Sequence, residues 1–539
     1  MNTYPEPRRK ACRPLIVLLL LVAALSAGCT IFPQGAYWPP MARHAPENAA
    51  GEAPAGSAET PKPPAAADIP PTAAAAAARR AELQPRIARR WSDEKLARSA
   101  REMDGGFGRA IYADAMQTVV WYYVEPVTYQ RLLVAGLESL RAALDNPEFR
   151  RRFPEAADDD RRARFAEALN ILLLKARAAD PRFAFQAADW LAAVMEKNRA
   201  MLGLPDGAIV SEFLFGAMDS LDPYSRYLTP EMLRTYEGQL AGEYAGIGAE
   251  IAVRGGRVFI KAVFEGGPAA KAGLKAGDEV AAVDGKPVAE VPLGDLTRRL
   301  RGKPGTTVTL GIRAGGEGEP RDVTLTRGTV HLPAARDAQM LDAARGIAYV
   351  RFTEFQEGAE EELRQAIGGL VRQGAKALVL DLRDNPGGSL LESVWAAGMF
   401  LDGGPVLRTR GRMSGATWTY DVPLFESRAW SGPLAVLVNE RSASAAEVLA
   451  SALEARGRAA IVGRRTYGKG AVQILFPIEW GKSAVCLTMA RVYDVKGACL
   501  DGRGVVPERD VAAPASPPGT LGDDPDVRAA VDLLGSAAK

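Results

Sequence analysis

Apolar residues recur at helical spacing in the first half of the chain. Stretches such as 129–144, 161–178 and 183–201 repeat them every three or four positions among Arg, Glu and Ala, which is typical of amphipathic helices. We therefore expect a helical region over residues 79–233. Its aromatic cluster, Trp121-Tyr122-Tyr123, is expected to lie in the helix core or at a subunit contact, and a ligand platform is the less favoured alternative.

The pattern then changes to short apolar runs separated by Gly, Pro and Asp. Runs of this kind predict β-strands bounded by turns. They fall at residues 248–253, 257–263, 279–283, 306–312 and 321–326. We expect a small β-rich module over residues 234–328.

From residue 346 onward, apolar strands alternate with amphipathic helices. Strands are expected at 347–352, 377–382 and 434–438, helices at 357–372, 389–400 and 445–456, further strands within 471–493, and a closing helix at 527–534. This alternation predicts an α/β core over residues 329–539. The expected fold class of the whole chain is multidomain α+β.

The N-terminus carries basic residues followed by a short apolar run. Residues 15–25 are apolar, follow a basic stretch at 8–13, and are too few to span a bilayer as a helix. The run ends in Leu25-Ser-Ala-Gly-Cys29, which resembles a bacterial lipobox, where the cysteine receives a diacylglycerol. We expect residues 1–28 to be a lipoprotein signal peptide and Cys29 to be lipidated; an ordinary signal peptide is the alternative.

Residues 29–78 are rich in Pro, Ala, Gly and Glu, a composition that does not bury enough apolar surface to order itself. We expect a disordered tether. Thr30 directly after the expected anchor is uncharged, which fits sorting to the outer membrane of a double-membraned bacterium, facing the periplasm.

The side-chain inventory narrows the chemistry. The net charge of the 539 residues is only +2, so the overall balance favours neither nucleic acid nor an acidic substrate. Only two histidines and four cysteines occur, so the chain offers few of the residues that a Ser-His-Asp triad or a zinc site requires. No cofactor or metal is expected. Cys486 and Cys499 are left open as either bridged or small buried residues.

A serine lies where a strand meets a helix. The apolar run 434–438 leads into a loop with Ser442 and Ser444 and then into a helix, whose N-terminal N–H groups favour a developing anion. The alternative is a helix cap, because Ser444 and Glu447 have the spacing of a capping box.

A lysine that could act as a base follows later in the chain. Lys469 lies between two glycines, and if extension begins there, Lys469, Ala471 and Gln473 share one face of a strand. Burial could lower the pKa of the lysine enough to leave a neutral fraction. The alternative is a solvated lysine in a glycine turn.

A glycine turn completes the candidate chemistry. The strand at 377–382 runs into Asn385-Pro-Gly-Gly388, where two glycines let backbone N–H groups approach a carbonyl oxygen, as an oxyanion hole requires. The same residues are also an ordinary turn signal.

These segments together resemble the C-terminal processing peptidases, also called tail-specific proteases. Residues 381–388 resemble the family's DLRxNPGG, residues 436–447 its VLVNxxSASASE, and residues 466–473 its TFGKGxVQ. The resemblance implies an α/β core of the ClpP/crotonase type. It also implies Ser444 as nucleophile, Lys469 as general base, Gln473 as the residue that orients the lysine, and the backbone N–H groups of Gly388 and Ala445 as the oxyanion hole.

The likeness extends to the β-rich module, which resembles a PDZ domain, a small β-rich barrel with two helices. Residues 220–228 resemble the SLDPHSxYL that precedes it, and residues 267–278 and 283–285 match within it. The peptide-carboxylate-binding loop would be Tyr244, Ala245, Gly246, Ile247 and Gly248. The matched length covers residues 110–137 and from 210 to the C-terminus.

The sequence also departs from the family pattern. Ala446 replaces the third serine of the motif, and residues 138–206 look like an insertion into the helical region. Asp384 and Arg441 occupy positions that the pattern leaves variable.

We therefore expect a serine endopeptidase that recognises the C-terminal tails of envelope polypeptides through its PDZ domain. The helical region could also form a homo-oligomer or bind a regulatory partner. The rival interpretations are a non-catalytic PDZ adaptor on a degenerate core and, less favoured, a Ser–Lys amidase acting on small amides or cell-wall peptides.

Overall fold

The computed structural model describes residues 73–537 except 104, 290, 424–427, 479–481 and 515–519. The chain forms two compact units: one runs up to Pro230 and includes Ile474–Leu487, and the other comprises Glu231–Gln473 and Thr488 onward. The expected signal peptide, Cys29 and most of the tether lie outside the described residues. Within the described residues, no helix combines the length and apolar character needed to cross a bilayer.

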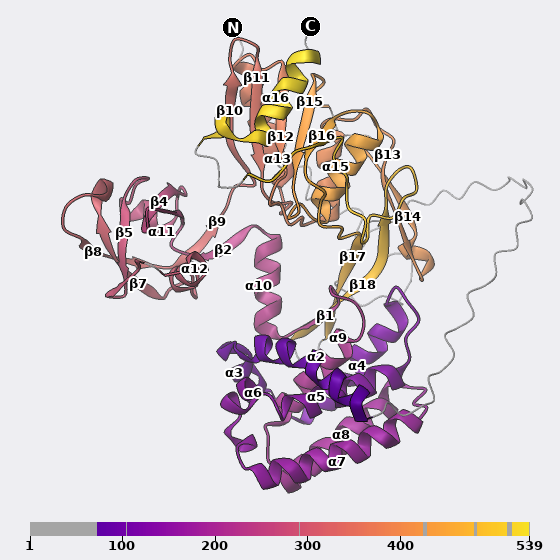
Figure 1. Cartoon of the computed structure of the whole chain (residues 1–539). Helices are drawn as coiled ribbons and strands as arrows, with labels where there is room; N and C mark the ends of the chain where they lie inside the picture. The colour runs from indigo at the N-terminus through magenta and orange to yellow at the C-terminus, as the bar shows by residue number, and fades with distance from the viewer. Residues whose placement is uncertain are drawn as a thin grey trace, which may run out of the picture. The chain divides into compact units, whose positions relative to one another are not determined.

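The first unit is built from helices (Figure 1). They are α2 (Ala73–Trp91), α3 (Glu94–Glu102), α4 (Gly105–Tyr122), α5 (Tyr129–Ala143), α6 (Pro147–Arg152), α7 (Asp159–Ala178), α8 (Ala184–Met201) and α9 (Asp206–Asp219). Helix α9 is buried from Gly207 to Met218. It packs closely on α5, because a side chain at Gly216 would come within 2.5 Å of Ser139 Cβ. The helical region expected from the sequence is therefore present, and α2 already begins at Ala73, inside the segment expected to be tether.

The aromatic cluster of this unit is mainly a packing feature. Tyr123 is buried in the helix core, while Tyr122 stacks on Phe476 with ring centroids 4.8 Å apart. Phe476 belongs to β17 (Ala471–Ile478), whose outer end is part of the same unit. Trp121 remains largely exposed.

The second unit begins with helix α10 (Pro230–Leu240), most of which belongs to it, and continues with the β-rich module. A sheet of order β3-β4-β5-β7-β8 encloses an apolar core together with helix α12 (Leu293–Leu300), which contributes Leu296 and Leu300. The strands of the module are β2 (Glu243–Gly246), β3 (Ala249–Arg254), β4 (Arg257–Val263), β5 (Glu279–Val283), β6 (Lys286–Pro287), β7 (Thr307–Arg313), β8 (Arg321–Thr326) and β9 (Gly328–His331), and α11 is Pro268–Lys271.

A six-stranded sheet of order β10-β11-β12-β15-β16-β19 forms the centre of the α/β core. Its strands are β10 (Ala335–Asp342), β11 (Ile347–Phe352), β12 (Ala377–Asp381), β15 (Leu434–Val438), β16 (Ala460–Gly463) and β19 (Arg509–Asp510). All neighbours pair in parallel except β10, which is antiparallel to β11.

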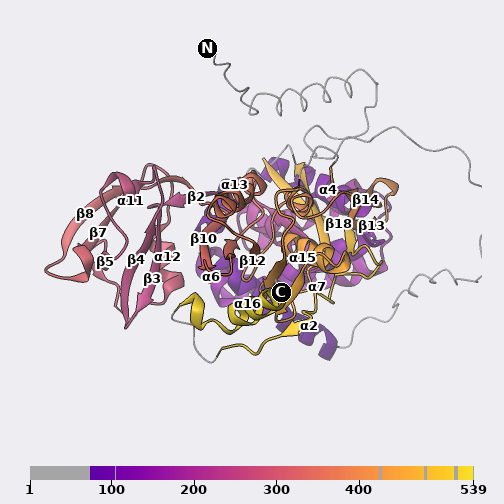
Figure 2. The same ribbon diagram turned by 90° about the horizontal axis from the view of Figure 1, so that it is seen from above.

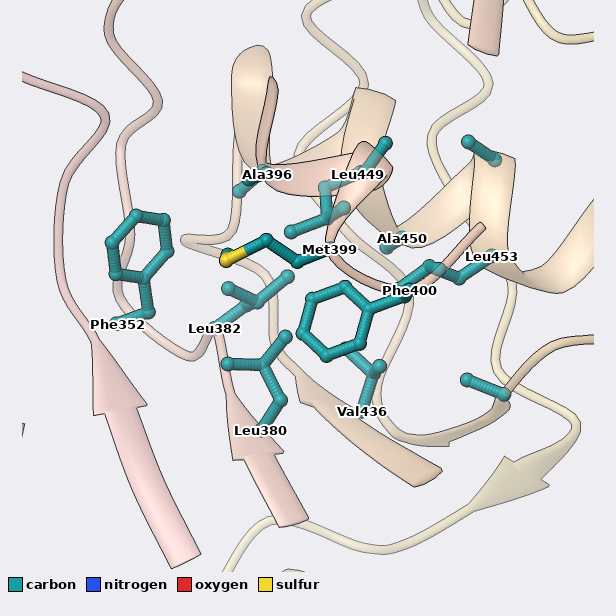
Figure 3. Close-up of a cluster of buried hydrophobic side chains, with 14 of the residues drawn as sticks. Phe352, Leu380, Leu382, Ala396, Met399, Phe400, Val436, Leu449, Ala450 and Leu453 are labelled. Carbon is teal, nitrogen blue, oxygen red and sulfur yellow. The ribbon is translucent and has the colours of Figure 1, made fainter. Parts of the chain in front are cut away.

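Helices cover both faces of this sheet (Figure 2). Helices α13 (Ala359–Arg372), α14 (Leu390–Gly398) and α15 (Ala445–Ala455) pack on one face, and Figure 3 shows Leu380 and Val436 of the strands meeting Leu449 and Phe400 there. Helix α16 (Pro525–Ala537) packs on the other face through Val527, Ala530 and Leu534. Alternate side chains along each strand point to opposite faces of the sheet, and both sets are buried, as expected of a sheet covered on both sides.

A smaller antiparallel sheet continues the core. Strand β18 (Ser483–Tyr493) pairs with β1 (Arg226–Leu228) through its first half and with β13 (Pro405–Gly411) through its second, and β13 pairs with β14 (Trp418–Asp421). Strand β17 also pairs with β18. Cys486 is buried in β18 and both it and Cys499 are free cysteines.

An ion-pair cluster fixes the end of the chain to the core. Arg383, which follows β12, donates to Asp381, Asp524 and Asp526 at 2.7 to 3.0 Å. The three carboxylates are almost fully buried. The cluster therefore anchors the start of α16 beside the loop that carries the glycine turn.

Candidate active site

Three loops meet at one edge of the central sheet. They follow the carboxyl ends of β12, β15 and β16, which are parallel neighbours in the sheet. The first carries the glycine turn, the second the serines and the third Lys469. The carboxyl ends of neighbouring parallel strands form the usual position of a site in α/β folds, and this topology brings together three motifs that are far apart in sequence.

Ser444 occupies an unusual backbone conformation directly before helix α15. Its φ is 56° and its ψ is −116°, a region that is unfavourable for residues other than glycine. Its backbone N–H donates to Glu447 at 2.8 Å, which is one half of the capping box expected from the sequence. Strain of this kind persists where the surroundings hold the residue in place.

Ser442 has a different role from Ser444. It is fully buried, its hydroxyl donates to the Leu382 carbonyl at 2.8 Å, and it accepts the Asn439 N–H at 3.0 Å. Ser442 thus joins the serine loop to the loop after β12. Ser444, by contrast, is only partly buried.

The buried carboxylate of Glu447 connects the serine loop to the lysine loop. Its side chain is fully buried. One oxygen accepts the N–H groups of Ser444 and Lys469, each at 2.8 Å. The other accepts the Thr466 hydroxyl at 2.5 Å and the Gly468 N–H at 2.6 Å. Because Ser444 and Lys469 share one acceptor atom, their backbone nitrogens lie no farther apart than the sum of those two bonds.

Strand β17 begins at Ala471 rather than at Lys469. Whether Lys469 shares a strand face with Gln473 therefore stays a prediction, and the contact to Glu447 fixes the Lys469 backbone N–H. Within the strand, Ala471 and Gln473 do have the same parity. The Gln473 amide donates to the Thr488 hydroxyl on β18 at 3.2 Å.

The glycine turn lies directly against Ser444. Gly387 has a φ of 100°, and a Cβ atom added to it would lie 2.7 Å from Ser444 Cβ and 2.9 Å from the Ala445 nitrogen. Gly388 has a φ of 140°. The turn is fixed on its other side, where Phe355 donates to the Gly387 carbonyl and accepts from Ser389, each at 2.8 Å. Since Phe355 pairs with the residues that flank Gly388, the N–H of Gly388 itself points away from Phe355.

Asn385 fixes the shape of the same turn. Its side chain donates to the Phe352 carbonyl at 2.8 Å and accepts the Gly387 N–H at 2.9 Å. Its carbonyl accepts the Ala443 N–H at 2.9 Å. Asn385, Glu447 and Thr466 are site residues to which the sequence analysis gave no catalytic or positioning role, although all three lie inside the motifs.

The loop expected to bind a peptide carboxylate lies at one end of the β-rich module. Residues 243–246 form β2, which pairs with β9, and residues 247 and 248 lead into β3, an edge strand of the sheet. The Tyr244 hydroxyl donates to Glu354 of the α/β core at 2.6 Å. Burial raises the pKa of both side chains. Cys29, the expected lipidation site, lies outside the described residues.

Residues 346–511 match the model of peptidase family S41, and residues 239–313 match that of the PDZ domain. The chain is 35% identical over 327 residues to a carboxyl-terminal-processing protease of Picosynechococcus, an alignment that covers 58% of this chain and 76% of that protein. It is 32% identical over 313 residues to a carboxy-terminal-processing protease of Bartonella bacilliformis, which covers 57% and 71% of the two chains. Among solved structures, it is similar to a photosystem II D1 C-terminal processing protease with 26% identity, 78% and 97% coverage and a TM-score of 0.41.

The fold class expected from the sequence is confirmed, with its helical region, PDZ domain and peptidase core. With both domain models matched and relatives aligned over most of their own length, the chain belongs to the carboxyl-terminal processing proteases, serine-type peptidases of family S41 that carry a PDZ domain.

Proposed function

We propose that this protein cleaves polypeptides with Ser444 as nucleophile, Lys469 as general base and Gln473 as the residue that orients the lysine. The observation that carries the proposal is the shared acceptor on Glu447, which holds the backbones of Ser444 and Lys469 together. The strained φ of Ser444 and the contact with Gly387 support it.

Each step can be assigned to a group of this site. Neutral Lys469 takes the hydroxyl proton of Ser444, whose oxygen attacks the substrate carbonyl and forms a tetrahedral oxyanion. The N–H groups of Gly388 and Ala445 stabilise that oxyanion. The protonated lysine then gives its proton to the leaving amine, and Ser444 is left as an acyl ester. Lys469 next takes a proton from water as the water oxygen attacks the ester carbonyl, and it returns that proton to the Ser444 oxygen as the acyl group leaves.

Gln473 acts on the lysine through its carbonyl oxygen. Its Nε2 group donates to Thr488, which fixes the plane of the amide and leaves Oε1 to accept from the Lys469 amine. The lysine is thereby directed toward Ser444. Replacing Gln473 with alanine is expected to lower kcat without abolishing it.

Substrate tails would enter through the PDZ domain. Strand β3 lies at the edge of its sheet, so an extended C-terminal tail can add to it as a further strand while the tail's carboxylate meets the N–H groups of residues 244–248. Substrates are then polypeptides with exposed C-terminal tails. We assign the helical region to an oligomer contact or a regulatory partner.

The location of the enzyme follows from the expected lipobox. Lipidation at Cys29 would attach the chain to the cell envelope, with the outer membrane facing the periplasm as the proposed site and envelope polypeptides as substrates. In fractionated cells, replacing Cys29 with serine is expected to release the protein from the membrane fraction. Retention of the variant in that fraction would contradict the anchor.

Two substitutions test the catalytic assignment. Ser444→Ala and Lys469→Met, assayed on an unstructured protein with a free C-terminus, are expected to lose cleavage, whereas Ser451→Ala retains it. Ser451 is a matched control because it is buried on the same helix and bonds only a backbone carbonyl. Cleavage by purified Ser444→Ala at the native rate would instead favour a non-catalytic adaptor and a contaminating protease.

A second comparison separates the endopeptidase from an amidase. The same substrate with an amidated C-terminus lacks the carboxylate that the PDZ loop would bind. We expect a raised KM for the amidated form, while small amides are poor substrates. Equal KM values for both forms would contradict the proposal that the PDZ loop binds the C-terminal carboxylate.

A further inference from the structure

Asp384 lies in the loop after β12, three residues before Gly387, in a left-handed backbone conformation. Its φ is 63°, a value that most residues with a side chain avoid but that aspartate adopts more readily, because its short polar side chain can form local hydrogen bonds. The partners of the Asp384 carboxylate therefore help to hold this conformation.

The Asp384 carboxylate accepts hydrogen bonds from two other segments. Asn439 Nδ2 and Arg441 Nε of the serine loop donate to one oxygen at 2.8 and 2.6 Å. Arg351 of β11 donates to the other oxygen at 3.1 Å. In return, Asn439 Oδ1 accepts the backbone N–H groups of Asp384 and Arg441 at 3.0 and 3.1 Å.

These contacts join the two halves of the proposed site. Asp384 lies three residues before Gly387, and Arg441 lies three residues before Ser444. A movement of Asp384 relative to Arg441 would shift the glycine turn relative to the serine. Sites of this kind tolerate displacements of only about 0.5 Å.

We propose that Asp384 is a positioning residue, which holds the oxyanion-binding turn in register with Ser444 through Arg441 and Arg351. The proposal rests on the proposed catalytic roles of Ser444 and Gly388. Asp384 and Arg441 both occupy positions that the family pattern leaves variable.

The ion pair between Asp384 and Arg441 contributes little to stability, so a positioning role can be measured apart from an effect on folding. The Arg441 side chain is 75% exposed and that of Asp384 36%, and exposed ion pairs contribute only about 0 to 1 kcal/mol to stability. The effect of losing the pair is therefore expected in kcat rather than in thermal stability. Substrate affinity set by the PDZ domain does not pass through this contact.

The test uses Asp384→Asn and Asp384→Gly, since asparagine and glycine both tolerate a positive φ. In the full-length protein acting on an unstructured peptide with a free C-terminus, we expect both variants to lose about tenfold in kcat, as a sub-ångström misplacement would cause. KM should change less than twofold. Arg441→Gln should lose less, and the double variant Asp384→Asn/Arg441→Gln no more than Asp384→Asn alone, because the two residues act as one unit.

Asp342→Asn is the matched control, because Asp342 ends strand β10 of the same sheet and pairs with Arg345 in the following turn, and among the described residues no hydrogen bond or ion pair joins Asp342 to these loops. It should retain native kcat. The inference is overturned if Asp384→Gly keeps native kcat, if the loss appears in KM alone, if the double variant shows the product of the single losses, or if Asp342→Asn loses as much. Ser444→Ala distinguishes the two levels: an active Ser444→Ala refutes the proposed function, whereas an inactive one beside active Asp384 variants refutes only the positioning role.

Discussion

Replacing Gly387 with alanine perturbs the point where the glycine turn meets Ser444. An added Cβ would lie 2.7 Å from Ser444 Cβ and 2.8 Å from the Ala443 carbonyl oxygen. Ordinary van der Waals contact begins at 3.4 Å, so restoring it requires the turn and the serine to separate by 0.7 Å, the difference between 3.4 and 2.7 Å. The φ of 100° adds a conformational cost of about 1 to 2 kcal/mol.

A displacement of this size exceeds the tolerance of a preorganised site, which is about 0.5 Å. It would move the N–H of Gly388, the proposed oxyanion donor, away from the developing oxyanion, and losing one such donor lowers kcat by about 10²- to 10³-fold. We expect Gly387→Ala to lose activity on this scale, with KM little changed because tail recognition lies elsewhere. Initial rates over a range of substrate concentrations measure both constants.

Gly374→Ala is the control for the conformational cost. Gly374 has a φ of 90° but open space around its Cα, so alanine there meets the same kind of strain without a clash. We expect Gly374→Ala to lower the melting temperature by a few degrees, as about 1 kcal/mol would, while kcat stays native. The reasoning is refuted if folded Gly387→Ala keeps kcat within twofold of the native enzyme, or if Gly374→Ala loses as much.

Three further perturbations test other parts of the fold. Glu447→Gln places an NH₂ group against N–H donors and should lower kcat by about 10²-fold, as a misplacement of about 1 Å would. Glu392 is the control, because it is a buried glutamate that accepts backbone N–H groups elsewhere, and Glu392→Gln should keep native kcat. Equal kcat losses in both variants would refute the role of Glu447 in connecting the serine and lysine loops. Arg383→Met leaves the buried carboxylates of Asp381 and Asp524 without their cation, while Asp526 keeps Arg464, and should destabilise the protein by about 3 to 5 kcal/mol in urea unfolding; an unchanged midpoint would contradict the anchoring role. The Arg257 hydrogen bond, aided by Arg313, holds the pKa of Glu279 below its usual value, so its stabilising effect is present above the unfolded pKa and is lost as the pH falls through the lower folded pKa. In hydrogen exchange of the PDZ domain, wild type should therefore be better protected than Glu279→Gln at pH 7, and the two should converge in that acidic range; a constant difference would rule this out.

The sequence predicts much of the secondary structure because apolar runs end at clear turn residues. Strands β4, β5, β8, β11 and β15 have the predicted bounds, and each is limited by Gly, Asp, Pro or Asn signals. Helix α13 begins two residues later than predicted, because Gly358 takes a φ of 80° in front of it.

Two of the undetected strands, β13 and β10, lack that apolar signature. Strand β13 alternates exposed Arg408 and Arg410 with buried Thr409, so its inward position is itself polar. Strand β10 lies at the edge of its sheet and has no fully buried residue. Their pairing comes from tertiary context, which a local pattern does not carry.

The three motifs were recognisable singly, but their joint arrangement depends on the sheet. The sequence does not specify that β12, β15 and β16 are neighbours, and only this order makes Glu447 a common acceptor for two loops. Strand parity relates Lys469 only to its own strand, whereas the contact of its backbone N–H with Glu447 comes from another loop. Local sequence patterns do not predict contacts between loops that lie far apart in the sequence.

The capping box at Ser444 and the proposed catalytic site share the same residues. In an ordinary cap, the glutamate would accept only the N–H of the capping serine. Here Glu447 is fully buried and accepts three further donors from the lysine loop, and a buried polar network holds a unique arrangement only when each of its members is satisfied. The cap therefore fixes the strained Ser444 and positions the Lys469 backbone at once. A local helix-start signal becomes a joint between two loops because a second loop supplies the remaining donors.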